Sequence, residues 1–365
     1  MILHLYFARK TIGALATVTG ILALLILMIE MIEQIRIFSS ADLSLGTLFY
    51  LSLLRIPFTL NTVFPIIMVI ATLVLFLGLS RSSELVITRA SGRSAMQSLL
   101  APLLVTFVVG LLVVAVLNPL GAATSREFDQ LKTEYLDEKT QVFSVSDEGL
   151  WLRQGDETGQ IVIRASRSNF DGSTLYDVSF LGFAASGAPE FRLEAKSAHL
   201  ETGLWKITDA KRWPLFKTGN PEAASQVFET YELPTSLTLD EIHDTFGTPS
   251  AVPIWEIPSF IARLEKAGFS ARAYKMWLHS ELALPLTLMA MMLIGAGFTM
   301  RHTRFGNTAS RVVTALLLAF AFFFLRNFAS ILGENGEIPI ILAAWAPPCA
   351  VILAALALLL HLEDG

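Results

Sequence analysis

Long apolar runs alternate with polar segments along this chain. Five runs contain no Asp, Glu, Lys or Arg, and a sixth contains a single charge, Arg326. A helix needs about 20 residues to cross a hydrocarbon core of roughly 30 Å. The pattern therefore predicts six transmembrane helices, the first a retained anchor because no cleavage site follows it. The six runs are 11–29, 56–80, 94–125, 282–300, 312–333 and 338–362.

Basic residues in the short loops predict the orientation of these helices. Cytoplasmic loops of membrane proteins carry an excess of Lys and Arg. With the N-terminus inside, eight basic residues fall in cytoplasmic segments and three in outer ones. Both termini are then cytoplasmic, and the long segment between the third and fourth helices is periplasmic in a double-membrane bacterium. The eight are Arg9, Lys10, Arg81, Arg89, Arg93, Arg301, Arg304 and Arg311, and the three are Arg36, Arg55 and Arg326.

The segment between the third and fourth helices changes period. Residues 140–232 contain short stretches with apolar residues at alternate positions, separated by turn dipeptides such as Ser186-Gly187 and Thr202-Gly203. This pattern is typical of a sandwich, jelly roll or partly open barrel. After Pro253 the spacing becomes helical, and Gly268 can end that helix. The expected strands lie at 142–145, 150–152, 161–163, 175–183, 191–195 and 204–207.

These patterns give a fold class and a domain plan. We expect an α-helical membrane protein with six transmembrane helices and an all-β, jelly-roll-like periplasmic domain inserted between helices three and four. The expected parts are helices one to three in 1–125 with a short cytoplasmic helix at about 81–94, the β domain in 126–252, a connector helix in 253–276, and helices four to six in 277–365.

Composition and charge exclude several classes of function. Of the 365 residues, 53% are hydrophobic and 16% charged, which disfavours an ordinary soluble enzyme. The net charge of −5 disfavours a nucleic-acid partner. Cys349 is the single cysteine, so the chain contains no internal disulfide. Nucleotide-binding and hydrolase motifs are absent from the sequence, as is metal-ligand spacing of the histidines, so we expect neither an enzyme nor a cofactor.

Carboxylates are rare in the apolar runs of the sequence. Glu30 and Glu33 lie at the outer end of the first run, and no proton relay is evident. A proton-driven carrier is therefore poorly supported. If the protein moves a substrate, we expect the energy to come from another subunit.

The cytoplasmic segment after the second helix has the pattern of a short amphipathic helix. It has a charged face and ends at a small residue, and its neighbours are transmembrane helices on both sides. A push on this segment would therefore move two spans, although a loop helix that only fixes topology explains the same pattern. Its candidate residues are Glu84, Leu85, Thr88, Arg89 and Gly92.

Several motifs resemble the LptF/LptG family, the permease subunits of the lipopolysaccharide-export ABC transporter. They are SELVITRASGRS after the second span, YFARKTIGAL at the N-terminus, IPSFIARLEKAGFSARAYKMWLHSELALPL, and RVVTALLLAF followed by GEIPIILAAWAPP. The resemblance covers essentially the whole chain. Within the family, the pattern is closer to the LptG branch.

The resemblance implies a set of partners. It implies a heterodimer with an LptF-like permease subunit on two LptB-like ATPase subunits, with the Glu84–Gly92 segment as the coupling helix. The β domain would be a jelly roll that contacts an LptC-like protein or the partner permease. Spans one and five would form a lateral gate for lipopolysaccharide, and the chain itself would hydrolyse no ATP.

The residues of the outer half are compatible with that substrate. Arg326 lies 15 residues beyond Arg311, or roughly 22 Å along a helix, which places it in the outer leaflet. Cations at this level can bind lipid phosphates, and neighbouring aromatic rings can line a wall for acyl chains. Arg326 could instead pair with an internal carboxylate, Arg36 could pair with Glu33, and the rings could simply face lipid. The candidate substrate-binding residues are Arg36, Arg55, Phe320, Phe323, Phe324 and Arg326.

Some members of the family carry a basic residue where this chain has Glu30, which implies that the partner supplies more of the positive charge. Two other functions fit the same sequence features. One is a permease of another lipid or lipoprotein ABC exporter. The other is a membrane scaffold that transports nothing and presents a periplasmic β domain.

Overall fold

The computed structural model divides the chain into two compact units, which are described separately. It describes residues 2–363 except 40, 42, 91, 93, 137–143, 147–148, 156–158, 170–172, 216–219, 236, 238–248, 267–269 and 301–307. The helical unit comprises 1–136, 250–255 and 274–365, and the β unit comprises 137–249 and 256–273. Gly268, expected to end the connector helix, lies outside the described residues.

The helical unit contains the predicted membrane spans. Within the part of the chain that the structure describes, five helical stretches are long and apolar enough to cross a membrane, and a sixth span forms if two helices that meet at 51° count as one. The fold class of a six-span helical membrane protein is therefore confirmed. The helices are α1 (Ile2–Ile37), α2 (Leu45–Arg81), α3 (Glu84–Ala90), α4 (Ala95–Leu112), a π-helical turn (Val113–Leu117), α5 (Asn118–Leu136), α8 (Arg272–Leu282), α9 (Leu284–Thr299), α10 (Thr308–Asn335) and α11 (Ile340–Glu363).

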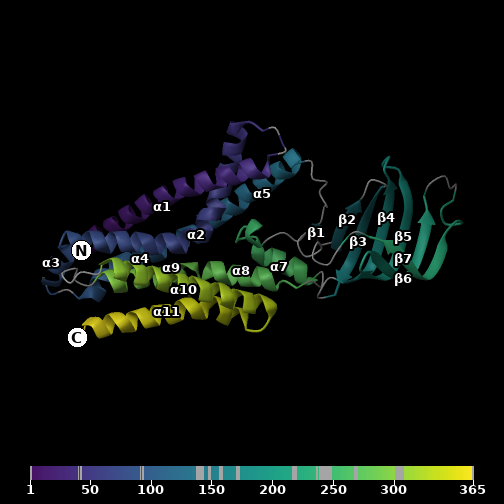
Figure 1. The fold of residues 1–365 in the computed structure, drawn as a ribbon. Coiled ribbons are helices and arrows are strands. Elements are labelled where there is room, and N and C mark those ends of the chain that lie inside the picture. The colour runs from purple at the N-terminus through teal and green to yellow at the C-terminus, as the bar shows by residue number, and fades with distance from the viewer. Residues whose placement is uncertain are drawn as a thin grey trace. The chain divides into compact units, whose positions relative to one another are not determined.

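The helices of this unit are longer than the apolar runs that predicted them. α2 begins at Leu45, eleven residues before the charge-free run, and contains Arg55 as well as two prolines. Both prolines are tolerated because neighbouring helices and local adjustments satisfy the freed backbone groups in a packed bundle. In Figure 1 the start of α1, the end of α11 and α3 all lie at the same end of the helical unit.

Close backbone contacts hold the bundle together around α9, of which 13 of 16 residues are buried. A Cβ atom added to Gly110 of α4 would lie 2.6 Å from the Cα of Pro285, and one added to Gly295 of α9 would lie 2.9 Å from a side-chain carbon of Thr72. Small residues at the contact let membrane helices approach this closely. The close approach matters because dispersion, and not the hydrophobic effect, drives their association. α1 is the opposite case, because only five of its 36 residues are buried.

The β unit is one antiparallel sheet of seven described strands. Each strand pairs with its neighbours in the sequence, from β1 to β7. The predicted inserted β domain is therefore confirmed. Its described strands connect consecutively, which differs from the two Greek keys of a jelly roll. The strands are β1 (Ser144–Ser146), β2 (Gly149–Gly155), β3 (Gly159–Ser168), β4 (Thr174–Ala184), β5 (Pro189–Glu201), β6 (Leu204–Pro214) and β7 (Gln226–Pro234).

One face of this sheet forms its own core. Phe180 of β4 and Trp205 of β6 are fully buried, and their rings meet edge to face at 6.3 Å. Alternate residues of each strand share a face, so the sheet must curve around these side chains to exclude water. Asp177 and Asp209 have positive φ angles of 52° and 54°, at positions where pairing with both neighbouring strands is interrupted. These aligned breaks allow the sheet to bend.

Among its described residues, the β unit also contains the helix α7 (Ile257–Lys266), which packs next to β1. It is amphipathic, with Ile257, Ile261 and Leu264 buried. The expected connector segment, 253–276, thus contains α7 and also the first residues of α8. The sequence pattern did not predict β7, which pairs with β6 along its length.

Candidate functional site

Helix α3 lies in the tight connection between two long helices. It follows Ser83, whose φ angle of 58° turns the chain sharply, and it ends before Gly92, whose φ angle is 80°. Asn, Asp and Gly are the residues that adopt positive φ most readily, so Gly92 suits this turn and Ser83 is strained. Because the turn at Ser83 is tight and α3 packs against α2, α3 can move little without moving α2.

The two faces of α3 have different surroundings. Leu85 and Thr88 are buried, and the Thr88 hydroxyl donates to the carbonyl of Glu84 at 2.8 Å. Val86 and Ile87 face outward, and the Ile87 side chain is 67% exposed. Leu85 and Thr88 were among the residues predicted from the sequence, whereas the two exposed apolar residues were not. Arg89 belongs to α3, but its side chain lies outside the described residues.

Glu84 links α3 to the first turns of α1. Its carboxylate accepts hydrogen bonds from the Tyr6 hydroxyl at 2.7 Å and from the Ser82 hydroxyl at 2.8 Å, and it attracts Lys10. Partial burial raises the pKa of Glu84, but the two hydrogen bonds and Lys10 outweigh that effect and hold it below its ordinary value. A charged Glu84 therefore joins α1, α2 and α3 at one end of the bundle.

A buried carboxylate lies inside the bundle, contrary to the expectation from sequence. Glu281, at the end of α8, is 4% exposed. It accepts a hydrogen bond at 3.1 Å from the amide of Asn118, and the amide of Asn61 lies 3.4 Å away. Arg326 of α10 is partly buried and interacts electrostatically with it. Amide donors and a nearby cation compensate for the cost of placing a carboxylate in an apolar bundle.

Asn118 directly follows the π-helical turn between α4 and α5. Such turns occur frequently at functional sites because the extra residue changes the direction of the side chains that follow. Here the Asn118 side chain donates to Glu281 and also accepts from the backbone N–H of Ile254 at 3.1 Å. Asn118 therefore connects the buried carboxylate to the 250–255 segment.

A second polar cluster surrounds Arg55 of α2. Its guanidinium lies 4.0 Å from Glu30 of α1, and it stacks 5.2 Å from the ring centroids of both Phe58 and Phe128. The Thr59 hydroxyl donates to the same Glu30 carboxylate at 2.7 Å. Glu30 is thus engaged by residues of α2.

Arg36, near the end of α1, forms an exposed ion pair with Glu33 at 2.6 Å. This pairing is the alternative to phosphate binding that the sequence left open for Arg36. Each of the three candidate arginines therefore has a different carboxylate as its neighbour. Among the described residues, no contact joins the three into one site.

Comparison with known proteins decides the family. A family model described as "Lipopolysaccharide export system permease LptF/LptG" matches residues 5–361. The chain belongs to the LptF/LptG permease family. Lipopolysaccharide export system permease protein LptG of Escherichia coli (strain K12) is 24% identical over 312 residues, which cover 85% of this chain and 84% of that protein. Its counterpart of the same name in Haemophilus influenzae (strain ATCC 51907 / DSM 11121 / KW20 / Rd) is 23% identical over 371 residues, or 95% of each chain.

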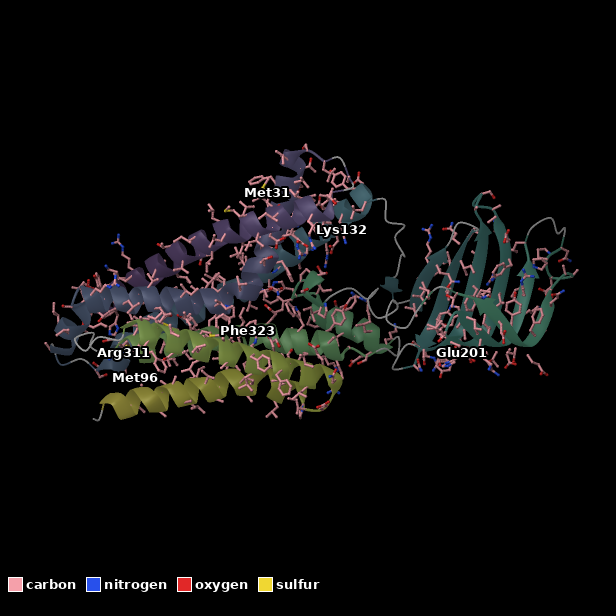
Figure 2. All side chains as sticks on the ribbon, in the orientation of Figure 1. Met31, Met96, Lys132, Glu201, Arg311 and Phe323 are labelled. Atoms are coloured by element: carbon pink, nitrogen blue, oxygen red, sulfur yellow. The ribbon has the colours of Figure 1, made fainter. Side chains whose placement is uncertain are left out.

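The aromatic residues of α10 in this LptF/LptG permease face two ways. Phe320 and Phe324 are 58% and 73% exposed, whereas Phe322 is buried and Phe323 packs against the bundle core. Figure 2 places Phe323 farther along α10 than Arg311, away from the end that contains α3. The outward rings can contact lipid or another subunit, and the inward ones stabilise the bundle.

The residues that sequence reasoning missed in this permease are polar and lie in or next to charge-free apolar runs. Asn61 and Asn118 lie within such runs and Glu281 directly precedes one, at positions where a polar side chain is costly without a partner. This placement was the available signal. Asn61 and Asn118 are 220 and 163 residues away from Glu281 in the sequence, so their pairing with it was not visible.

Proposed function

We propose that this permease is the LptG-type subunit of an ATP-driven exporter that extracts lipopolysaccharide from the outer leaflet of the bacterial inner membrane. Family membership over residues 5–361 carries the proposal. The excess of basic residues in the α3-side loops supports a cytoplasmic location for α3 and both termini. The β unit is then periplasmic, and an LptF-like subunit completes the substrate path.

In this proposal α3 is the coupling helix for two LptB-like ATPase subunits. The exposed pair of Val86 and Ile87 supports this role, because an apolar face on a seven-residue helix suits a groove on a partner. Leu85 and Thr88 anchor the opposite face in the bundle. Closure of the ATPase pair pushes α3, and Glu84 transmits the movement to α1 through Tyr6.

The coupling proposal is tested with Ile87→Asp. The variant should lose the co-purifying ATPase, because a charge replaces an apolar contact at the interface. Val227→Asp is the matched control, since Val227 is an apolar residue that is 76% exposed and belongs to β7 of the other unit. Retention of the ATPase by Ile87→Asp to the same extent as by the control would exclude α3 as the docking helix.

Arg326, in the outer half of α10, is the first proposed phosphate-binding residue, with Arg36 and Arg55 as further cations. Arg326→Gln should reduce crosslinking to a photoreactive lipopolysaccharide. The matched control is Glu281→Gln, which removes the neighbouring charge but keeps the cation and should preserve crosslinking. Equal crosslinking in Arg326→Gln and the unmodified protein would show that Arg326 does not bind the lipopolysaccharide phosphate.

The open side of β7 supports strand addition by the periplasmic domain of a partner. Among the described strands, β7 pairs only with β6, so its other edge presents unpaired backbone groups. We assign this edge to an LptC-like protein or to the partner permease. Crosslinking from positions in β7 would identify the partner.

Two other functions predict different results in the lipopolysaccharide crosslinking assay. A membrane scaffold would capture no lipopolysaccharide, and a lipoprotein exporter would capture lipoprotein instead.

A further inference from the structure

A cavity of about 640 Å³ lies where α1, α2 and α3 meet. This is the end of the helical unit that also carries the start of α1 in Figure 1. The cavity belongs neither to the arginine clusters nor to the exposed face of α3. Its walls combine charged side chains at one level with small and apolar residues at the next.

The inner part of the cavity is lined by residues without bulk. Gly13 and Ala14 of α1 face Gly78 of α2, and Val74 and Leu75 continue the apolar wall. A Cβ atom built on Gly13 or on Gly78 would meet no other atom within 4 Å. Two helices that diverge at small residues leave a slot whose surface is hydrocarbon, and such a slot suits an acyl chain.

The mouth of the cavity is basic. Arg9 and Lys10 line it, and the Lys10 ammonium lies 5.4 Å from the ring centroid of Tyr6. Glu84 is the one carboxylate among the lining residues, and hydrogen bonds from Tyr6 and Ser82 already engage both of its oxygens. Among the described residues, Arg9 has no ion-pair partner, so it is available to an anion.

Two cations above an apolar slot match one kind of membrane molecule. We propose that this cavity binds an anionic phospholipid of the leaflet that surrounds α3, with its phosphate at Arg9 and Lys10 and one acyl chain between Gly13 and Gly78. Cations near a membrane surface attract anionic headgroups, and each buried methylene adds to the affinity. The lipid contacts α1, α2 and α3 together and so stabilises their junction.

The site is separate from the lipopolysaccharide path. This inference rests on the proposed function in one respect only, the assignment of the surrounding leaflet as the cytoplasmic one. Binding of the phospholipid can be measured without export activity, so failure of one proposal leaves the other open to its own test.

The experiment uses the full chain with its co-purifying partners in vesicles of phosphatidylethanolamine and phosphatidylglycerol. A phosphatidylglycerol carrying a diazirine on one acyl chain is photoactivated, and mass spectrometry maps the modified peptides. We expect modification of residues 9–14 and 74–79. A photoreactive phosphatidylcholine in the same vesicles should label these peptides several-fold less.

Gly13→Leu and Gly20→Leu form a matched pair for this assay. Both glycines lie on α1 with open space at Cβ, but only Gly13 lines the cavity. Gly13→Leu should reduce labelling about tenfold, because the new side chain excludes several methylenes of the lipid. Gly20→Leu should retain labelling. Gly78→Leu provides a second test of the slot if Gly13→Leu does not assemble.

Substitution of both cations, Arg9→Gln with Lys10→Gln, should abolish the preference for phosphatidylglycerol over phosphatidylcholine. Equal labelling in Gly13→Leu, Gly20→Leu and the unmodified protein would overturn the proposal. Labelling that does not depend on the headgroup would also overturn it, because such labelling indicates ordinary boundary lipid. Crosslinks from these positions to a partner subunit would overturn it as well. Displacement by soluble glycerol phosphate alone would indicate a free-anion site instead.

Discussion

The amide of Asn118 donates to Oε2 of Glu281 at 3.1 Å, while its carbonyl oxygen accepts from the backbone N–H of Ile254 at the same distance. One side chain thus satisfies a buried carboxylate and a buried backbone donor. A buried polar group that loses its partner costs more than the net value of the hydrogen bond it made. Asn118 is therefore a point where the stability of α5, α8 and the 250–255 segment can be tested together.

Asn118→Leu should lower the stability of the bundle by about 2 kcal/mol, because it removes one amide donor from the Glu281 carboxylate and the side-chain acceptor of the Ile254 N–H. Thermal unfolding of the purified protein in detergent measures the loss. The double variant Asn118→Leu with Glu281→Gln should recover part of it, since the charge no longer needs compensation. Identical melting temperatures for Asn118→Leu and the unmodified protein would contradict this account.

The sequence predicted the membrane spans because each contains a long charge-free run. It did not predict that α2 begins at Leu45, because Arg55 looked like the end of a span. In the structure Arg55 lies inside the helix, where Glu30 and two aromatic rings compensate its charge. A charge ends a span only when nothing in the bundle can pair with it, and a single sequence does not reveal that partner.

The β unit illustrates the same limit. Buried strands such as β4 alternate apolar and polar residues and were predicted, but β7 was not. Leu233 is the only buried residue of β7, so this strand contributes little to the core and is held mainly by its pairing with β6. The candidate site divides similarly: local pattern predicted α3, whereas the contacts of Glu84 and Glu281 with distant residues required the fold.

Gly110→Ala should destabilise the bundle by about 1–3 kcal/mol, because the new methyl group would overlap the backbone of Pro285. The same change at Gly20, where the space is open, should be neutral or slightly stabilising, since alanine favours helix more than glycine does. Comparing the two melting temperatures isolates the contact between α4 and α9. If Gly110→Ala and Gly20→Ala unfold at the same temperature, these helices are not packed this closely.

Arg326 and Glu281 should behave as a coupled pair in a double-mutant cycle. Arg326→Gln and Glu281→Gln each remove one charge, and the double variant removes both. We expect a coupling free energy of about 0.5–3 kcal/mol in thermal or denaturant unfolding, the range for residues that interact directly. Additive effects would mean that the two charges do not interact in the folded protein, and Arg36→Gln with Glu281→Gln provides the non-interacting comparison.

Glu222 ties the connection between β6 and β7 to the sheet. Lys211 and the indole N–H of Trp213 donate to its carboxylate and hold its pKa below the ordinary value of 4.5. A depressed pKa adds stability above pH 4.5, and this is lost as the pH falls through the lowered pKa. Glu222→Gln should therefore increase hydrogen exchange in residues 220–228 at pH 7, but not at a pH below the lowered pKa. Glu232→Gln, on exposed β7, is the control, and an effect of Glu222→Gln that is independent of pH would contradict the prediction.

Tyr6→Phe should partly uncouple ATP hydrolysis from lipid extraction without dissociating the complex. The variant keeps the ring beside Lys10 but removes the 2.7 Å hydrogen bond to Glu84, so α3 loses a direct link to α1. A hydrogen bond to a charged group at a solvent-accessible site is worth about 1 kcal/mol, which corresponds to roughly a fivefold fall in lipid extracted per ATP hydrolysed. The ATPase should still co-purify because Val86 and Ile87 are unchanged. Tyr50→Phe, a similarly exposed tyrosine on α2, should keep the full ratio. An unchanged ratio in Tyr6→Phe would mean that movement reaches α1 by another route, through the packing of α2 alone.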